Sequence, residues 1–204
     1  MLFAGEEYPF TSPGLLDFFF SGGENARMSR LVPASWMNGS PRRIIVHWTA
    51  GGPAPSAVDV EHYHILVHST GRLTRGEHAI ADNDSCADDD YAAHTRGCNT
   101  GAVGVALCGM AGAVRKPFRA GPYPLTRPQW NSCLLVLADL CRRYALSPEP
   151  GVVLMHCEVE AQLGRPQAGK WDIERLPFDR GDWAGMSPGE ELRARVALLL
   201  KETP

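Results

Sequence analysis

The sequence predicts an α/β fold in which a mixed central β-sheet is flanked by helices. Short apolar runs bounded by Pro and Gly, at 44–46 and 152–155, are consistent with buried strands. The segment 62–73 has the turn residues of a β-hairpin, and 126–146 and 188–201 are predicted to be helices. The 204 residues are enough for one domain with a sizeable core.

The elements are expected in a simple order along the chain. Residues 1–28 are an N-terminal appendage, for which packing on the domain is favoured over binding a protein partner, and 29–204 form the domain proper. The first strand is 43–48, followed by a Gly- and Pro-rich loop that leaves His47 accessible. A buried strand is predicted at 102–107. Thr126 caps the helix 126–146, with Pro128 in its first turn and an apolar stripe along one side.

Three histidines lie in the first arm of the predicted hairpin. Alternation along a strand places His62, His64 and His68 on the face opposite Tyr63. A metal site is one interpretation, and a solvated strand face is the favoured one. The Asp-rich segment 82–91 is expected to be a surface loop, because like charges repel. A calcium site there is disfavoured because the glycine and final glutamate of such loops are missing.

Composition and charge exclude several classes of protein. The net charge of -3 and the pI near 6.2 provide no basic field for nucleic acid. No apolar segment is long enough to span a membrane, and Glu6 and Glu7 stand where a secretory signal carries basic residues. We therefore expect no nucleic-acid or membrane partner, and synthesis in the cytoplasm without a signal peptide. The six cysteines form no CxxC pair and are expected to be free.

Two histidines follow predicted buried strands. His47 follows the run 44–46, His156 follows 152–155, and Asp172 lies in a loop beyond. The carboxyl ends of strands are where α/β proteins build sites, and imidazole with carboxylate suits zinc, leaving a fourth position for water. Alternation would place Lys170 on the same side as Asp172. The alternative is that each histidine is packed and hydrogen-bonded without a metal.

Five blocks carry a resemblance that spans about residues 31–180. In order they are 44–50 (IIVHWTA), 63–65 (YHI) with the turn at Gly71, 93–99 (AHTRGCN), 103–107 (VGVAL), and 156–159 (HCEV) with 169–172 (GKWD). Together they resemble the zinc-dependent N-acetylmuramoyl-L-alanine amidases of the type-2 family, which includes phage lysis amidases and peptidoglycan recognition proteins. An ordered set of five is far more specific than any single block.

The resemblance implies one zinc ion per chain, held by His47, His156 and Asp172. It implies that Lys170 is a catalytic cation and that Tyr63 sits over the reacting water.

It further implies that His94, with Asn99 and Trp48, lines the substrate groove. Part of the family has a glutamate in the strand that here contains Ala106, so this sequence is closer to the phage lysis branch. The Pro-Gly that often follows the last ligand is replaced by Ile173 and Glu174.

The expected function is hydrolysis of the amide bond between N-acetylmuramic acid and L-alanine of peptidoglycan stem peptides. Such an enzyme would act on the cell wall after release, for example through a phage lysis pathway. One alternative is a peptidoglycan-binding module without activity, which the complete set of ligands disfavours. Another is a lysis enzyme that contacts a second protein through residues 1–28. A generic zinc peptidase is disfavoured because HExxH is absent.

Overall fold

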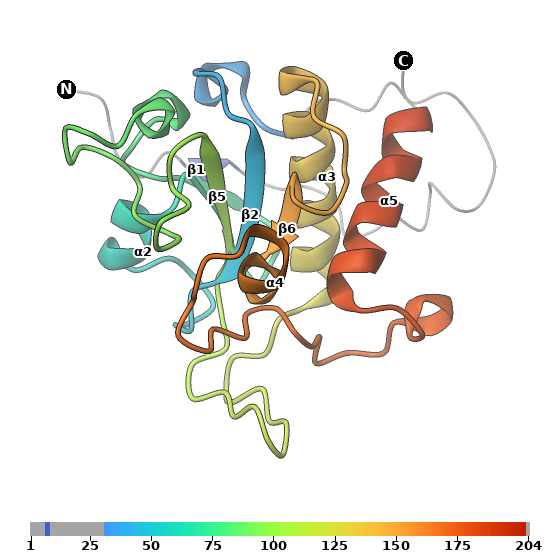
Figure 1. Ribbon diagram of the computed structural model, residues 1–204. Coiled ribbons are helices and arrows are strands. Elements are labelled where there is room, and N and C mark those ends of the chain that lie inside the picture. Colours follow the sequence, from blue (N-terminus) through green and yellow to red (C-terminus); the bar gives the residue numbers. More distant parts are fainter. Residues whose placement is uncertain (1–6, 9–30, 203–204) are drawn as a thin grey trace.

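The computed structural model describes residues 7–8 and 31–202 as a mixed β-sheet with helices on both sides (Figure 1). The elements are β1 (Glu7–Tyr8), η1 (Ala34–Trp36), β2 (Arg43–Trp48), α2 (Ala57–His62), β3 (Ile65–Val67), β4 (Leu73–Arg75), η2 (Ile80–Asp84), β5 (Ala102–Leu107), α3 (Arg127–Tyr144), β6 (Val153–Met155), η3 (His156–Glu158), α4 (Val159–Leu163), η4 (Gly181–Trp183) and α5 (Pro188–Glu202). The predicted fold class is confirmed.

The sheet has the strand order β1-β4-β3-β5-β2-β6. Strand β2 lies next to the edge strand β6 and pairs in parallel with both β5 and β6, while β3 pairs in parallel with β5 and antiparallel with β4. The predicted strands 43–48 and 102–107 are confirmed to the residue. Of the appendage, only β1 is described, and it pairs antiparallel with β4. The rest of residues 1–28, including the surface predicted for a protein partner, lies outside the described residues.

Alternation along β2 and β6 separates the main core from the opposite face of the sheet. Ile44 and Val46 on β2 belong to the main apolar cluster, which also contains the buried face of α3 and residues of α5. Ile45 and Leu154 belong to a second cluster, which also contains Val159 of α4. Because successive side chains of a strand point to opposite faces, His47 shares the face of Ile45 rather than that of the main core.

Helix α3 is the predicted helix, and its start follows from the sequence. The Thr126 hydroxyl accepts from the Gln129 backbone N–H, and the Gln129 side chain accepts from the Thr126 backbone N–H, which is a capping box. The Gln129 side-chain amide also donates to Val67 O at 2.7 Å and Cys108 O at 2.9 Å. Gln129 therefore caps the start of the helix and also links it by hydrogen bonds to the ends of β3 and β5.

The predicted hairpin begins later than expected. Residues 57–62 form helix α2, which starts with a capping box between Ser56 and Asp59, and His62 lies in its last turn. The capping box starts a helix here, although the residues from His62 onward alternate as in a strand. The favoured interpretation of the histidine cluster as a solvated strand face was wrong, because His64 is 2% and His68 5% exposed.

Each of these two histidines has a hydrogen-bond partner in the interior. His64 contacts the side chain of Asn83 and accepts from the Gly104 backbone N–H, while His68 contacts the Thr74 hydroxyl. They therefore stabilise the fold rather than cover its surface. No helix among residues 31–202 is both long and apolar enough to cross a membrane. All six cysteines are free, as predicted.

Candidate metal centre

His47 and His156 meet because their strands are neighbours in parallel register. Val46 of β2 pairs with Met155 of β6, and each histidine follows its paired residue directly. Adjacent strands lie about 4.8 Å apart, and the two imidazole centroids are 4.5 Å apart. Both rings are buried, at 0% and 4% exposure. Sheet register therefore places two imidazoles side by side from residues 109 positions apart.

Asp172 closes a triangle with the two histidines. The loop after α4 returns to η3, where Asp172 O accepts from the Cys157 backbone N–H at 2.7 Å. Asp172 Oδ2 then lies 3.0 Å from His156 Nδ1 and 3.3 Å from His47 Nδ1, and the two Nδ1 atoms are 3.0 Å apart. Among the described residues, these three form the one group of His, Cys, Asp and Glu side chains with metal-binding geometry.

The hydrogen bonds of Gln167 determine which nitrogen of His156 carries a proton. Gln167 is buried, and its side-chain amide nitrogen donates to Arg96 O and Arg165 O, both at 3.1 Å. Its oxygen must then face His156 Nε2, at 3.0 Å, because a flipped amide would set oxygen against two carbonyls. His156 Nε2 therefore donates to Gln167, and the neutral ring presents the Nδ1 lone pair to the centre.

A second set of hydrogen bonds orients His47 in the same way. His94 Nε2 lies 3.4 Å from Ala102 O, to which it donates, so His94 Nδ1 is an acceptor. His47 Nε2 lies 3.2 Å from that nitrogen and 3.3 Å from the Thr95 hydroxyl. A proton on His47 Nε2 satisfies both contacts and leaves the Nδ1 lone pair free. Gly104 is needed here, because a Cβ on it would lie 2.6 Å from the His94 ring.

The buried triangle thus consists of three acceptor atoms and suits a cation. Burial lowers the pKa of His47 to about 4, which keeps the ring neutral as a metal ligand requires. Burial opposes the charge on Asp172, but the adjacent imidazoles of His156 and His47 outweigh it and lower the pKa of the carboxyl. In a tetrahedral zinc site, ligand atoms about 2.0–2.1 Å from the metal are about 3.3 Å apart. The observed separations of 3.0–3.3 Å fit zinc.

The other residues predicted for the site line a cavity of about 530 Å³ with His156 and Asp172. Tyr63, at the end of α2, has its ring 5.2 Å from that of His47. Burial, followed by the charges of Asp172 and Asp59, raises the pKa of Tyr63, so its hydroxyl stays protonated. Lys170 is exposed at the cavity.

The three residues predicted to bind substrate also lie at this cavity, with different surroundings. Trp48 packs edge-on against Trp171, with the ring centroids 4.5 Å apart. Asn99 accepts from the Thr95 backbone N–H at 2.7 Å. His94 is 7% exposed and its ring lies between those of His47 and His64. His94 is therefore mostly buried against His47, and little of its side chain is exposed to the cavity.

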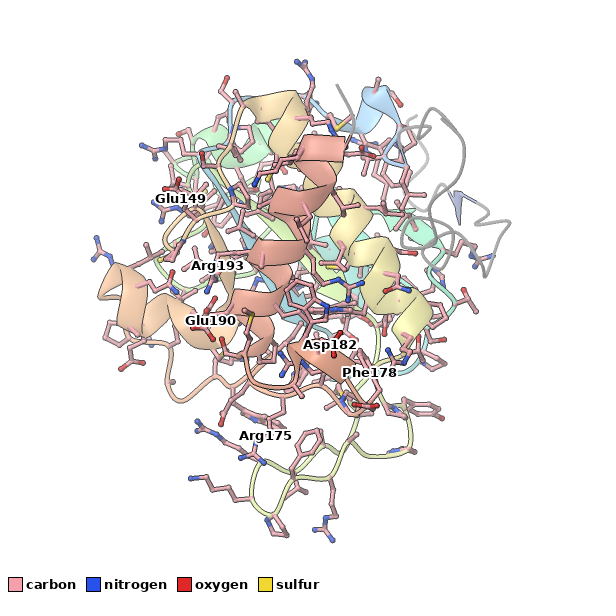
Figure 2. The ribbon with its side chains drawn as sticks, turned by 90° about the vertical axis from the view of Figure 1, so that its right-hand side faces the viewer. Glu149, Arg175, Phe178, Asp182, Glu190 and Arg193 are labelled. Atoms are coloured by element: carbon pink, nitrogen blue, oxygen red, sulfur yellow. The ribbon has the colours of Figure 1, made fainter. Side chains whose placement is uncertain are left out.

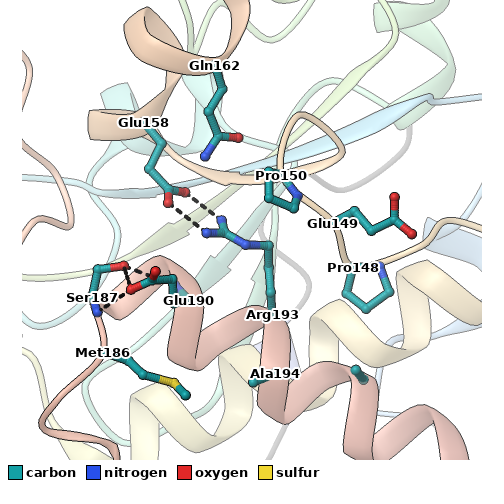
Figure 3. A pocket seen from close by; sticks show the side chains of 11 residues that line it. Pro148, Glu149, Pro150, Glu158, Gln162, Met186, Ser187, Glu190, Arg193 and Ala194 are labelled. Atoms are coloured by element: carbon teal, nitrogen blue, oxygen red, sulfur yellow. Dashed lines mark hydrogen bonds and ion pairs between the residues drawn. The ribbon is translucent and has the colours of Figure 1, made fainter.

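Glu158, two residues after His156, points away from the triangle. Glu158 is bound by both terminal nitrogens of Arg193, at 2.8 and 2.9 Å, and accepts from the Met155 backbone N–H (Figure 3). It faces a second cavity between α5 and the 148–150 loop, not the site. This ion pair anchors the turn that presents His156.

The sequence did not predict Gln167 and Thr95 as hydrogen-bond partners of the two histidines. Both residues come from irregular loops, where no sequence spacing indicates which residues will meet.

Comparison with known proteins agrees with this geometry. The family Amidase_2, N-acetylmuramoyl-L-alanine amidase, matches residues 37–173. The chain belongs to this family. The match spans every residue of the triangle and the cavity wall from Trp48 to Asp172, and it supports an amidase that acts on peptidoglycan. The chain has no match among curated proteins.

Several solved structures are similar to the chain at low identity. The endolysin amidase LysCS from Clostridium intestinale URNW is 17% identical, with 84% of this chain and 93% of that chain covered and a TM-score of 0.47. The Ph2119 endolysin of a Thermus scotoductus MAT2119 bacteriophage is 17% identical, with 77% and 87% covered and a TM-score of 0.45. The complex of peptidoglycan recognition proteins LCa and LCx with tracheal cytotoxin is 18% identical, with 76% of this chain and 87% of that chain covered and a TM-score of 0.45.

Proposed function

We propose that this protein is a zinc-dependent hydrolase that cleaves the amide bond between N-acetylmuramic acid and L-alanine of peptidoglycan stem peptides. The observation that carries the proposal is the buried triangle of His47 Nδ1, His156 Nδ1 and Asp172 Oδ2 at the edge of an open cavity. Three acceptors from protein side chains leave one position of a tetrahedral zinc ion for water or substrate, which distinguishes a catalytic from a structural site. Family membership supplies the substrate class.

The residues of the site have separate tasks in this reaction. His47, His156 and Asp172 would hold one zinc ion per chain, which lowers the pKa of water and polarises a carbonyl when bound. The Lys170 ammonium lies at the cavity beside Asp172, where it would attract the negative charge that develops on the scissile carbonyl oxygen. The protonated hydroxyl of Tyr63 would orient the attacking water. His94, Trp48 and Asn99, which also line the cavity, would contact the substrate.

A role as a peptidoglycan-binding module without activity is the alternative from another class. Such a module has no need of a metal site in which both histidine tautomers are set by buried partners. Here Gln167 and the pair His94 and Thr95 orient the two imidazoles. This arrangement favours the enzyme. We further propose that it acts on the cell wall after release from the cell that makes it.

Purified muropeptides provide the direct test. The protein should release peptides with a free L-alanine amino group, identified by mass, and a chelator should stop the reaction until zinc is restored. Cleavage that persists after complete removal of the metal would contradict the zinc mechanism. Binding of muropeptides without any cleavage by the zinc-loaded protein would establish the alternative.

A further inference from the structure

A basic loop projects beside the candidate substrate cavity. It comprises residues 111–124 between β5 and α3 and extends from the lower end of the molecule in Figure 1; we name it the Phe118 loop. Two backbone hydrogen bonds between Val114 and Arg119, 2.8 and 2.9 Å long, close its tip. The tip is therefore a short antiparallel turn that presents its side chains at a defined place.

Four cationic side chains gather at this tip and on the segment packed against it. Arg115, Lys116, Arg119 and Arg175 are all exposed. Of these four, only Arg115 has a carboxylate at ion-pair distance among residues 31–201, namely Glu174 at 2.7 Å. A chain with a net charge of -3 thus concentrates uncompensated positive charge here.

Aromatic contacts join the loop to the cavity wall. The Phe118 ring centroid lies 6.5 Å from that of Trp171, which in turn lies 4.5 Å from that of Trp48. Both tryptophans line the cavity. The Arg175 guanidinium lies 6.0 Å from the Phe118 ring, beside the loop in Figure 2. A substrate that extends along the tryptophan wall therefore reaches the cations of the loop.

We propose that the Phe118 loop binds the carboxylates of the stem peptide, which makes it a specificity element of the hydrolase. The inference rests on the proposed function and deepens it. The sugar half of the substrate is uncharged, because its lactyl carboxyl is part of the scissile amide, whereas the peptide half keeps free carboxylates. Only the peptide half complements a row of exposed cations. The loop thus sets the direction of the substrate, with the peptide along Trp48 and Trp171.

The test compares two soluble muramoyl peptides, one with free carboxylates and one with the same carboxylates amidated. The variant is Lys116→Gln/Arg119→Gln, which removes two exposed charges and leaves the backbone bridge intact. We expect KM for the free-carboxylate substrate to rise about 3- to 10-fold, the effect of two exposed ion pairs, with kcat unchanged. KM for the amidated substrate should stay the same. Salt well above 0.1 M should remove the difference, because it screens exposed charges.

A matched control removes two exposed cations at the other end of the molecule. Arg143→Gln/Lys201→Gln, at the ends of α3 and α5, should leave both KM values unchanged. Equal KM changes for the two substrates, or none, would overturn the proposal. So would loss of binding to anionic phospholipid vesicles with KM unaffected, which would assign the loop to a lipid surface.

Failure of the proposed function gives a separate result. If the wild type cleaves neither substrate, binding of the uncleaved free-carboxylate peptide still tests the loop by tryptophan fluorescence. Binding that weakens about 3- to 10-fold in Lys116→Gln/Arg119→Gln supports the loop as a carboxylate site even then. Equal binding by the wild type and this variant overturns it.

Discussion

Replacing Gln167 should weaken zinc binding although Gln167 does not touch the metal. In the wild type, the Gln167 oxygen accepts from His156 Nε2 at 3.0 Å and so keeps the Nδ1 lone pair directed at the triangle. In Gln167→Leu, the ring is free to move its proton to Nδ1, where Asp172 Oδ2 accepts it at 3.0 Å. Zinc must then displace a hydrogen bond to a carboxylate before it binds.

The magnitude follows from that hydrogen bond. A hydrogen bond to a charged group contributes about 1.5–3 kcal/mol, which corresponds to a zinc dissociation constant about 10- to 150-fold higher. Loss of an outer partner of a metal-bound histidine typically weakens metal binding by about 10- to 100-fold, in agreement. The two carbonyls left by Gln167, Arg96 O and Arg165 O, belong to exposed residues, so water can replace the lost donor. The metal-free fold should therefore change little in stability.

The assay is competition for zinc with a chromophoric chelator, together with ¹⁵N spectra of the metal-free imidazoles. Gln167→Leu should bind zinc at least 10-fold more weakly and move the His156 proton to Nδ1. Gln167→Glu keeps an acceptor for His156 Nε2 but sets a carboxylate oxygen against Arg96 O and Arg165 O, so it should bind zinc more tightly than Gln167→Leu and less tightly than the wild type. Gln162→Leu is the matched control, because Gln162 bonds to the Gly151 N–H and faces the other cavity (Figure 3). If Gln167→Leu held zinc as tightly as the wild type, the tautomer argument would be refuted.

Four further predictions address the ligands, the chemistry and the fold. His156→Ala should lose zinc and activity together, because the remaining two ligands bind zinc poorly; stoichiometric metal in the purified variant would rule out the ligand assignment. Lys170→Ala should lower kcat about 100- to 1000-fold with zinc content unchanged; a rise in KM alone would make Lys170 a binding residue. Tyr63→Phe should lower kcat about 100-fold; full activity would remove the hydroxyl from the mechanism. Burial lowers the pKa of His64 to about 3, so the unfolded state binds its proton first and stability falls as pH drops from about 6.5; urea titrations of metal-free protein should show a shallower fall for His64→Gln, and an unchanged slope would contradict this.

Much of the fold was predictable because its signals are local. The strand 102–107 is a continuous apolar run and 43–48 contains the apolar run 44–46, as expected for strands covered on both faces. Helix α3 carries its capping box at Thr126 and an apolar stripe. The start of β3 was missed because a second capping box, at Ser56, opens a helix of only six residues. So short a helix has too little apolar periodicity to stand out against the alternation that follows.

The candidate site was predictable only in part, for a different reason. The residues of the triangle stand next to recognisable strands or in a recognisable block, so motif and topology together bring them to one place. The residues that orient these ligands have no such signal in the sequence. Gln167 belongs to an irregular loop, and its role depends on Arg96 O, 71 positions earlier. Likewise Glu158, which holds the turn after β6, forms its ion pair with Arg193 of the last helix, 35 positions later.

Each of the two histidines needs its own hydrogen-bond partner to fix its tautomer. Parallel register alone brings His47 Nδ1 and His156 Nδ1 to 3.0 Å, where two lone pairs repel unless a proton or a cation lies between them. If either ring changed tautomer, a hydrogen bond would replace the metal. Gln167 prevents this for His156, and His94 with Thr95 prevents it for His47. Each support comes from a loop outside the sheet, so strand register sets the distance between the ligands and the loops set their protonation.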